Sequence, residues 1–297
     1  MMTSRHRPEP PPGKTVRYVS NMFPDPTTSE FCLHQDVRYG MTPSLMQRDA
    51  RIRISCSGIG ESDVVAFFEP AYHGHYGRSE DLVDVLERAA LEIIQFGTDA
   101  YEIRDAGEGP LAITPIMSGT WHVAGNTLTQ DVPSRDEIEG SPFRVVLTEG
   151  EFCVLKSSEI SPNEADRMRR QLRELDFSGS GAMRGLDLRV DISKAQAASD
   201  VAILRATAPI GWLPRPRPKS MIDHYIAFRT LRFRKFLATL RNDILAGLND
   251  ALHTVGGRRN FEASLSISGL RSADEFQAAI DSLLAGTVGP SVIGDFW

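Results

Sequence analysis

The feature that most limits the possible folds is a long segment in the last third of the chain. It runs from Ser220 to Val255, contains no proline and includes only Gly247 as a glycine, before Gly256 and Gly257. Proline and glycine interrupt helices most strongly, so this segment predicts one α-helix of roughly 50 Å at 1.5 Å per residue. Apolar residues recur along it at spacings of three, four and seven, which predicts one continuous buried stripe. The stripe consists of Ile222, Ile226, Phe233, Leu237, Leu240, Ile244, Leu248 and Val255.

Cations gather in the middle of this predicted helix, at Arg229, Arg232, Arg234, Lys235 and Arg241, although the formal net charge of the chain is -6. At 100° per residue, Arg232 and Lys235 fall on one border of the apolar stripe, and Arg234 and Arg241 fall on the other. Tight non-specific binding to nucleic acid needs many phosphate contacts, which an acidic chain does not favour. We interpret these cations first as the borders of a buried helix contact.

The composition is that of ordinary soluble domains, with 41% hydrophobic and 24% charged residues among 297. No apolar run approaches the length of about 20 residues that spans a bilayer, so we expect no membrane insertion. Prolines between Pro8 and Pro12 predict an extended or disordered arm rather than a signal peptide, and hence a cytoplasmic site of synthesis. Cys32, Cys56 and Cys153 form no CxxC motif, which favours unpaired structural thiols.

The middle of the chain alternates short apolar runs with turn residues. A helix over 79–96 is predicted, with Ser79 as N-cap and Gly97 as terminator, and it follows two predicted strands at 51–57 and 63–69. Short strands are then predicted at 100–104, 111–117, 120–124, 127–130, 143–148 and 151–156. The loops between them are too short for parallel crossovers, so we expect an antiparallel meander and an α+β fold.

A second predicted helix covers 161–177 and opens with a capping box from Ser161 to Glu164. The glycine-rich run at 178–185 then indicates a flexible connector, and 186–192 and 201–206 indicate strands of a small excursion. The segment 208–220 is typical of a polyproline-type tether. Its cations Arg215, Arg217 and Lys219 could contact phosphates, or could simply keep a linker solvated.

The last part of the chain predicts a half-buried strand at 261–267 and a helix from Ser272 to Gly286, opened by a capping box. The chain thus divides into five predicted regions. They are an N-terminal arm (1–50), an α+β domain (51–160), a helix with a small β excursion and tether (161–218), the long helix (219–257) and a C-terminal strand and helix (258–297).

No catalytic motif is evident. His73 and His75 could place both imidazoles on one face of a strand, but a catalytic zinc needs a third protein ligand, and no HExxH or HxxEH motif supplies one. The chain also has no GxSxG motif and no Walker lysine loop. We therefore expect no catalytic residues, no metal and no cofactor.

With this order of elements, the chain resembles the portal proteins of tailed bacteriophages, the ring-shaped head-tail connectors at one capsid vertex. "LERAALEIIQFGTDAYEIRD" is similar to the family's helix, glycine and strand entry, here with Gly97, Ala100, Tyr101 and Ile103. "GPLAITPIMSGTWHVAGN" and "GEFCVLKSSE" resemble the strands that follow. "LRFRKFLATLRNDILAGLNDALH" and "FEASLSISGLRSADEFQAAIDSLLAGTVGPS" resemble the family's long helix, returning strand and final helix.

The resemblance implies a wing-like α+β domain at 51–160, with the stem and clip placed by order at 161–218. It implies a structural, non-enzymatic ring of twelve subunits in the virion, through which double-stranded DNA is packaged and ejected. Its partners would be the major capsid protein, the terminase and a head–tail adaptor. A closed ring repeats one heterologous contact, so the long helix is expected to meet its neighbours. The expected interface residues are Ile226, Arg232, Phe233, Arg234, Lys235, Leu237, Leu240, Arg241, Ile244 and Leu248.

Two other interpretations stay open from the sequence. One is a metal-dependent hydrolase built around His73 and His75. The other is a cytoplasmic α+β scaffolding or adaptor protein that uses the long helix for partner contacts. The chain also departs from the family pattern, because portals are usually longer and the N-terminal elements and any crown are short or missing here.

Overall fold

The structure, a computed structural model, describes residues 13–15, 27–41, 51–68, 82–105, 111–132, 143–184, 192–214 and 221–296. Its helices are α1 (Thr28–Met41), α2 (Glu61–Phe68), α3 (Leu82–Phe96), α4 (Pro162–Arg184), α5 (Ile192–Ala206), α6 (Asp223–Arg259), α7 (Ala273–Leu284) and the 3-10 helix η2 (Pro290–Phe296). Its strands are β1 (Arg51–Ser57), β2 (Thr98–Asp105), β3 (Leu111–Pro115), β4 (Trp121–Ala124), β5 (Thr127–Val132), β6 (Phe143–Leu147), β7 (Phe152–Lys156) and β8 (Glu262–Ser268). Every strand pair in these ranges is antiparallel, which confirms the predicted α+β class.

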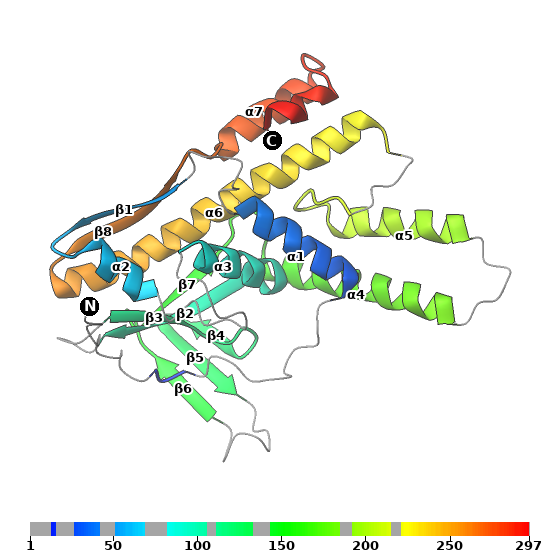
Figure 1. Cartoon of the computed structure of the whole chain (residues 1–297). Helices are drawn as coiled ribbons and strands as arrows, with labels where there is room; N and C mark the ends of the chain where they lie inside the picture. Colours follow the sequence, from blue (N-terminus) through cyan, green and yellow to red (C-terminus); the bar gives the residue numbers. More distant parts are fainter. Residues whose placement is uncertain are drawn as a thin grey trace, which may run out of the picture.

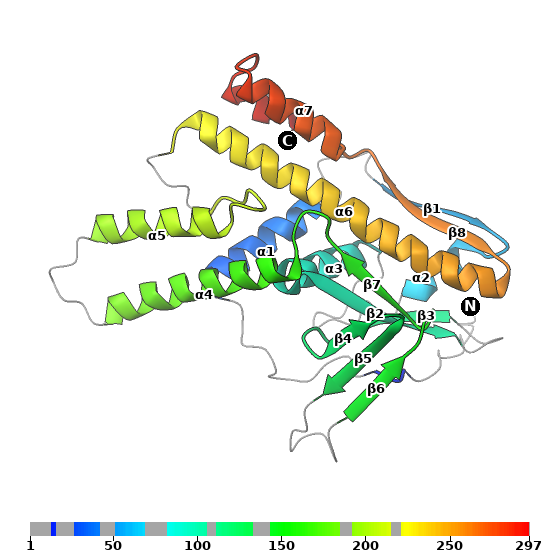
Figure 2. The same cartoon turned by 180° about the vertical axis from the view of Figure 1, so that it is seen from behind.

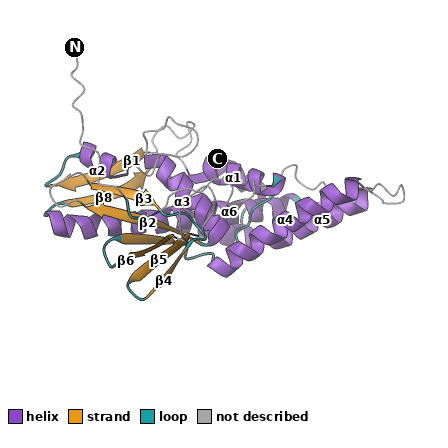
Figure 3. Ribbon diagram, turned by 90° about the horizontal axis from the view of Figure 1, so that it is seen from below, coloured by secondary structure: helices purple, strands orange, loops and turns teal. Residues whose placement is uncertain are grey.

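The long helix α6 is the central element, and it has 37 residues. In Figures 1 and 2, α7 lies along one side of α6, and α4 and α5 lie on the other side. Figure 3 shows the strands gathered at one end of the molecule, while α4 and α5 extend at the opposite end. The helix runs through Gly256 and Gly257, where the sequence predicted its end, and stops at Asn260, whose left-handed conformation lets its N–H donate to the Gly256 carbonyl.

The strands form three small sheets instead of the one meander that was predicted. Only β4-β5-β6 follows the order of the chain, while β7 leaves β6 and pairs with β2 in the order β3-β2-β7. The reason lies in β2, whose residues between its two ends are all buried. A strand buried on both faces belongs in the middle of a sheet, so it takes β3 on one edge and β7 on the other. The third sheet is the pair β1-β8.

The main core lies where α3, α1 and α6 pack together over the β3-β2-β7 sheet. A smaller core joins α7 to the first half of α6, and a third fills the space between the two three-stranded sheets. The predicted capping boxes form at both helix starts. The Ser161 side chain pairs with Glu164 in α4, and that of Ser272 pairs with Glu275 in α7.

Several predicted elements differ from the structure. The segment predicted as a strand at 63–69 is helix α2, because Val64, Phe67 and Phe68 are spaced to bury one helical face. The N-terminal region predicted as an extended or disordered arm contains α1, which buries Leu33, Val37 and Met41 in the main core.

The connector and excursion after the second predicted helix are also different. α4 continues through the glycine-rich run to Arg184, and the predicted strand at 201–206 is the last part of α5. Ile203 and Ala206 are both buried, and a spacing of three residues places them on one face of a helix. The predicted N-cap Ser79 and most of the segment 186–192 lie outside the described residues.

Candidate functional site

The cations of α6 bind groups of the same chain. Arg229 is 2% exposed, and its Nη2 donates to the carbonyl of Trp212 and, at 2.9 Å, to the hydroxyl of Thr207. Arg232 donates to the Pro209 carbonyl at 3.1 Å. Burial lowers the pKa of Arg229, yet a guanidinium stays charged because its ordinary pKa is so high. These arginines therefore clamp the segment after α5 onto α6.

The other cations of the cluster have similar roles. The Arg241 guanidinium donates to the Arg271 carbonyl at 3.2 Å, and burial lowers its pKa to about 10. The Lys235 ammonium lies 3.5 Å from a carboxylate oxygen of Glu159. Burial also lowers the pKa of Arg234. These contacts of Arg241 and Lys235 are with groups of their own chain.

The second half of the apolar stripe of α6 is covered within one chain, whereas Ile222, Ile226 and Phe233 in its first half are exposed or half-buried. The side chains of Leu237, Leu240, Ile244 and Leu248 are each at most 2% exposed. The cover comes from several elements, because α6 packs against α1, α3, α7, β7 and β8. Ile226 and Phe233 are half-buried, so they remain the apolar interface candidates with accessible area.

The predicted tether is packed in its first half. Ile210 and Trp212 are at most 1% exposed, and the indole N–H of Trp212 donates to the Asp36 carboxylate of α1 at 2.9 Å. The interpretation as a tether missed the two large apolar side chains that lie between Pro209 and Pro214. Arg215, Arg217 and Lys219 lie outside the described residues.

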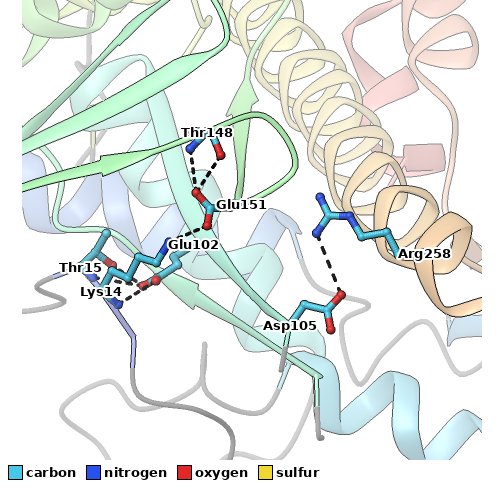
Figure 4. A network of polar contacts seen from close by, with 7 residues as sticks. All are labelled: Lys14, Thr15, Glu102, Asp105, Thr148, Glu151 and Arg258. Carbon is cyan, nitrogen blue, oxygen red and sulfur yellow. Dashed lines mark hydrogen bonds and ion pairs between the residues drawn. The ribbon is translucent and has the colours of Figure 1, made fainter. Parts of the chain in front are cut away.

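A polar network joins the N-terminal segment to β2 and to the turn before β7 (Figure 4). Glu102, which is 3% exposed, accepts hydrogen bonds from the backbone N–H of Lys14 at 2.8 Å and from the Thr15 hydroxyl at 2.7 Å. The Lys14 ammonium donates to Glu151 at 2.5 Å, and together with Thr148 it lowers the pKa of Glu151 to about 2. The network fixes Lys14 and Thr15 against β2 and the turn before β7, which sequence reasoning did not predict.

Another carboxylate ties the end of α6 to the same strand. Asp105 of β2 accepts from the Arg259 Nε at 2.9 Å, and a nitrogen of Arg258 lies 4.0 Å from its other oxygen. Cations in the last turn of a helix also interact favourably with its dipole. On the far side of α6, the Asn249 amide bonds both backbone groups of Leu265, at 2.9 and 2.6 Å, and so holds β8.

Asp99 on β2 is a fully buried carboxylate, at 0% exposed. Burial raises its pKa to about 7, and the nearby Arg88 opposes this increase only in part. The Arg88 guanidinium lies 5.6 Å from the centre of the Tyr101 ring, so a cation, an acid and a phenol share the space between α3 and β2. The cost of burying the charge therefore favours a protonated Asp99 in the folded state.

Replacing Asp99 by Asn should therefore change how stability depends on pH. The folded pKa lies above the unfolded value near 3.9, so the native state binds more protons between about pH 4 and 7. Stability due to Asp99 is fully present below pH 4 and falls by up to about 1.4 kcal/mol per pH unit until pH 7. Burial lowers the pKa of His34 to about 4, so its contribution to stability rises with pH over part of the same pH range. The quantity to compare is therefore the difference in free energy of unfolding between wild type and variant. Urea unfolding at pH 4.5, 6 and 8 checks this, and a difference that does not vary with pH contradicts it.

The remaining sequence candidates do not form a common site in the described part of the chain. His73 and His75 lie outside it, and His34 is half-buried with its ring 3.1 Å from the Gln95 amide, whereas His122 and His253 are exposed. No group of three or more His, Cys, Asp or Glu residues is arranged to hold a metal within the described ranges. The three cysteines are free thiols. No helix in these ranges is long and apolar enough to cross a membrane.

The geometry defines an α+β protein organised around a long, clamped helix. No family model matches the chain, and no curated protein matches it. Among solved structures, it is similar to the crystal structure of a HK97 family phage portal protein from Corynebacterium diphtheriae. The two chains are 13% identical, with 86% of this chain and 99% of that chain covered, and the TM-score is 0.43. A similarity this loose carries no argument about what this chain does.

Proposed function

We propose that this chain is the subunit of a portal-like ring, a structural and non-enzymatic assembly at a capsid vertex. The observation that carries the proposal is the order of the elements built by the portal-like segments. "LERAALEIIQFGTDAYEIRD" forms α3, a left-handed Gly97 and β2, and the last segments form α6, the returning strand β8 and α7. The resemblance rests on these same segments, so sequence and fold agree in order.

In this proposal the ring, of twelve subunits as the resemblance implies, encloses a channel for double-stranded DNA. The major capsid protein, the terminase and a head–tail adaptor are its partners, and the virion is its location. The acidic net charge of -6 suits a channel through which a duplex slides, because phosphates are not held tightly by an acidic surface. Contacts with phosphates would be few and local, with Arg215, Arg217 and Lys219 as the candidates.

Replacing Arg215, Arg217 and Lys219 together by Gln is expected to weaken DNA association without changing assembly. Each lost phosphate contact lowers the slope of log affinity against log salt by about 0.9, so the slope should fall by up to about 2.7. Filter binding of a duplex at several salt concentrations measures the slope, and electron microscopy checks the particles. An unchanged slope, or loss of the particles, contradicts the assigned role.

A further inference from the structure

We infer that the groove between α4 and α5 receives the outer face of α7 from a second copy of this chain. The contact would give the proposed ring its repeated joint, and in that sense it rests on the proposed function. It does not use the buried residues Leu237, Leu240, Ile244 and Leu248 of α6.

The groove has a volume of about 600 Å³ and lies between the two helices that extend from the body. Leu175 of α4 with Ala202 and Ala206 of α5 supplies apolar lining. The charged residues of the lining are Arg167 and Glu174 of α4 and Arg205 of α5, all exposed, so two cations face one carboxylate. A hollow that combines apolar lining with a net positive charge is suited to an apolar side chain flanked by carboxylates.

The outer face of α7 has this composition. Asp274 and Asp281 are seven residues apart, both are exposed, and so they lie on one helical face. Leu284, three residues after Asp281, is 63% exposed, which is high for a leucine at the end of an amphipathic helix. The opposite face of α7, with Phe276 and Ile280, is already buried against α6. The acidic and apolar face is therefore the one available to a partner.

More apolar surface lies at the same end of the α6–α7 pair. Ile222 is 69% exposed and Tyr225 is 38% exposed at the start of α6. In Figures 1 and 2 the start of α6 lies beside the end of α7. Large exposed apolar side chains gathered in one place are typical of surfaces that bind another protein.

The two surfaces cannot meet within one molecule, because α7 and the α4–α5 pair lie on opposite sides of α6 (Figures 1 and 2). Between copies they form a heterologous contact, in which different patches of identical chains meet. Such a contact repeats from copy to copy and generates a ring if the rotation closes, or a filament if it does not. This placement, together with the opposite charges, favours a second copy over an unrelated acidic partner.

Charge exchange tests the contact. Arg205→Glu and Asp281→Arg should each lower the association constant between copies at least tenfold, because each places like charges across the joint. The double variant Arg205→Glu/Asp281→Arg should restore association, and so should an equal mixture of the two single variants, since every joint in the mixture can then pair opposite charges. Leu284→Ala should weaken association without any change of charge.

Analytical ultracentrifugation of the full chain over a range of concentrations measures these constants, with circular dichroism as the check on folding. Arg170→Glu is the matched control, because Arg170 is exposed on α4 but does not line the groove. If large particles form equally well with every charge-exchange variant, the proposed ring stands and this contact is wrong. If only dimers or filaments form, and the charge exchanges change their association constant as expected, this contact stands and the ring is wrong. A monomer at every concentration would overturn both.

Discussion

Replacing Gly97 by Ala is expected to lower the free energy of unfolding by about 4 kcal/mol or more, enough to unfold many domains. The backbone at Gly97 has a φ of 80°, and a Cβ there would lie 2.2 Å from the Cα of Pro162 and 2.6 Å from its nitrogen. The obstacle is backbone, so no side-chain rotation relieves it. Either α3 separates from the start of α4, or β2 shifts in its sheet. Urea unfolding followed by far-ultraviolet circular dichroism measures the loss.

Gly125→Ala is the matched control. Its φ of 60° is also left-handed, but no heavy atom lies within 4 Å of an added Cβ. That substitution should cost only about 1 kcal/mol, from the backbone conformation alone. If both variants lose the same small amount, the close approach of Gly97 to Pro162 is not what requires glycine there.

Replacing Arg229 by Met is expected to lower the free energy of unfolding by about 3 kcal/mol. The methionine fills part of the same volume, but the Trp212 carbonyl and the Thr207 hydroxyl lose the donor that they share. Hydrogen bonds from a charged donor contribute about 1.5–3 kcal/mol each. The Trp212 carbonyl keeps only the hydrogen bond from the Thr207 hydroxyl, at 3.0 Å. The segment 207–214 should loosen first, and the fluorescence of Trp212 should shift to longer wavelength as it reaches water.

Arg258→Met serves as the control, because it removes the same charge from an exposed side chain of the same helix. The ion pair of Arg258 with Asp105 is long, at 4.0 Å, and an exposed pair of this kind usually contributes less than about 1 kcal/mol. An equal loss in the two variants would mean that helix propensity or net charge, rather than the clamp, explains the effect of Arg229. The double variant of Arg229→Met with Thr207→Val should be less than additive, since both residues belong to one network.

Local patterns were enough to predict α3, most of the strands, both capping boxes and α6. In each of these segments the periodicity, the cap residue or the turn residues agree. The prediction failed where a short apolar run fits either state. The segment 63–69 is one such run, and only its packing against α3 and β3 makes it a helix. The pairing of β7 with β2 was also beyond local reasoning, because it depends on the burial of β2 on both faces.

The sequence showed the cluster of cations on α6 but not the groups that they contact. The cations of α6 were interpreted as the borders of a buried helix contact, and the partners described for Arg229, Arg232, Lys235 and Arg241 lie in the same chain. Arg229 and Arg232 donate to the backbone carbonyls of Thr207 and Pro209. Every residue has such a carbonyl, so the sequence does not indicate which ones accept. Trp212 was the available clue, because a tryptophan in a proline-rich segment indicates a packed turn as readily as a tether.

The measurement that tests the central claim most directly is the mass of the assembled protein. Multi-angle light scattering of the purified chain, and of the chain co-expressed with its capsid partners, should reveal particles of many subunits. Negative-stain microscopy should show them as rings with a central channel. Each subunit contributes 32.8 kDa, so a ring of about twelve, the number that the resemblance implies, is easily separated from a monomer or dimer. A monodisperse species near the subunit mass in both preparations, at every concentration tested, would contradict the portal-like account.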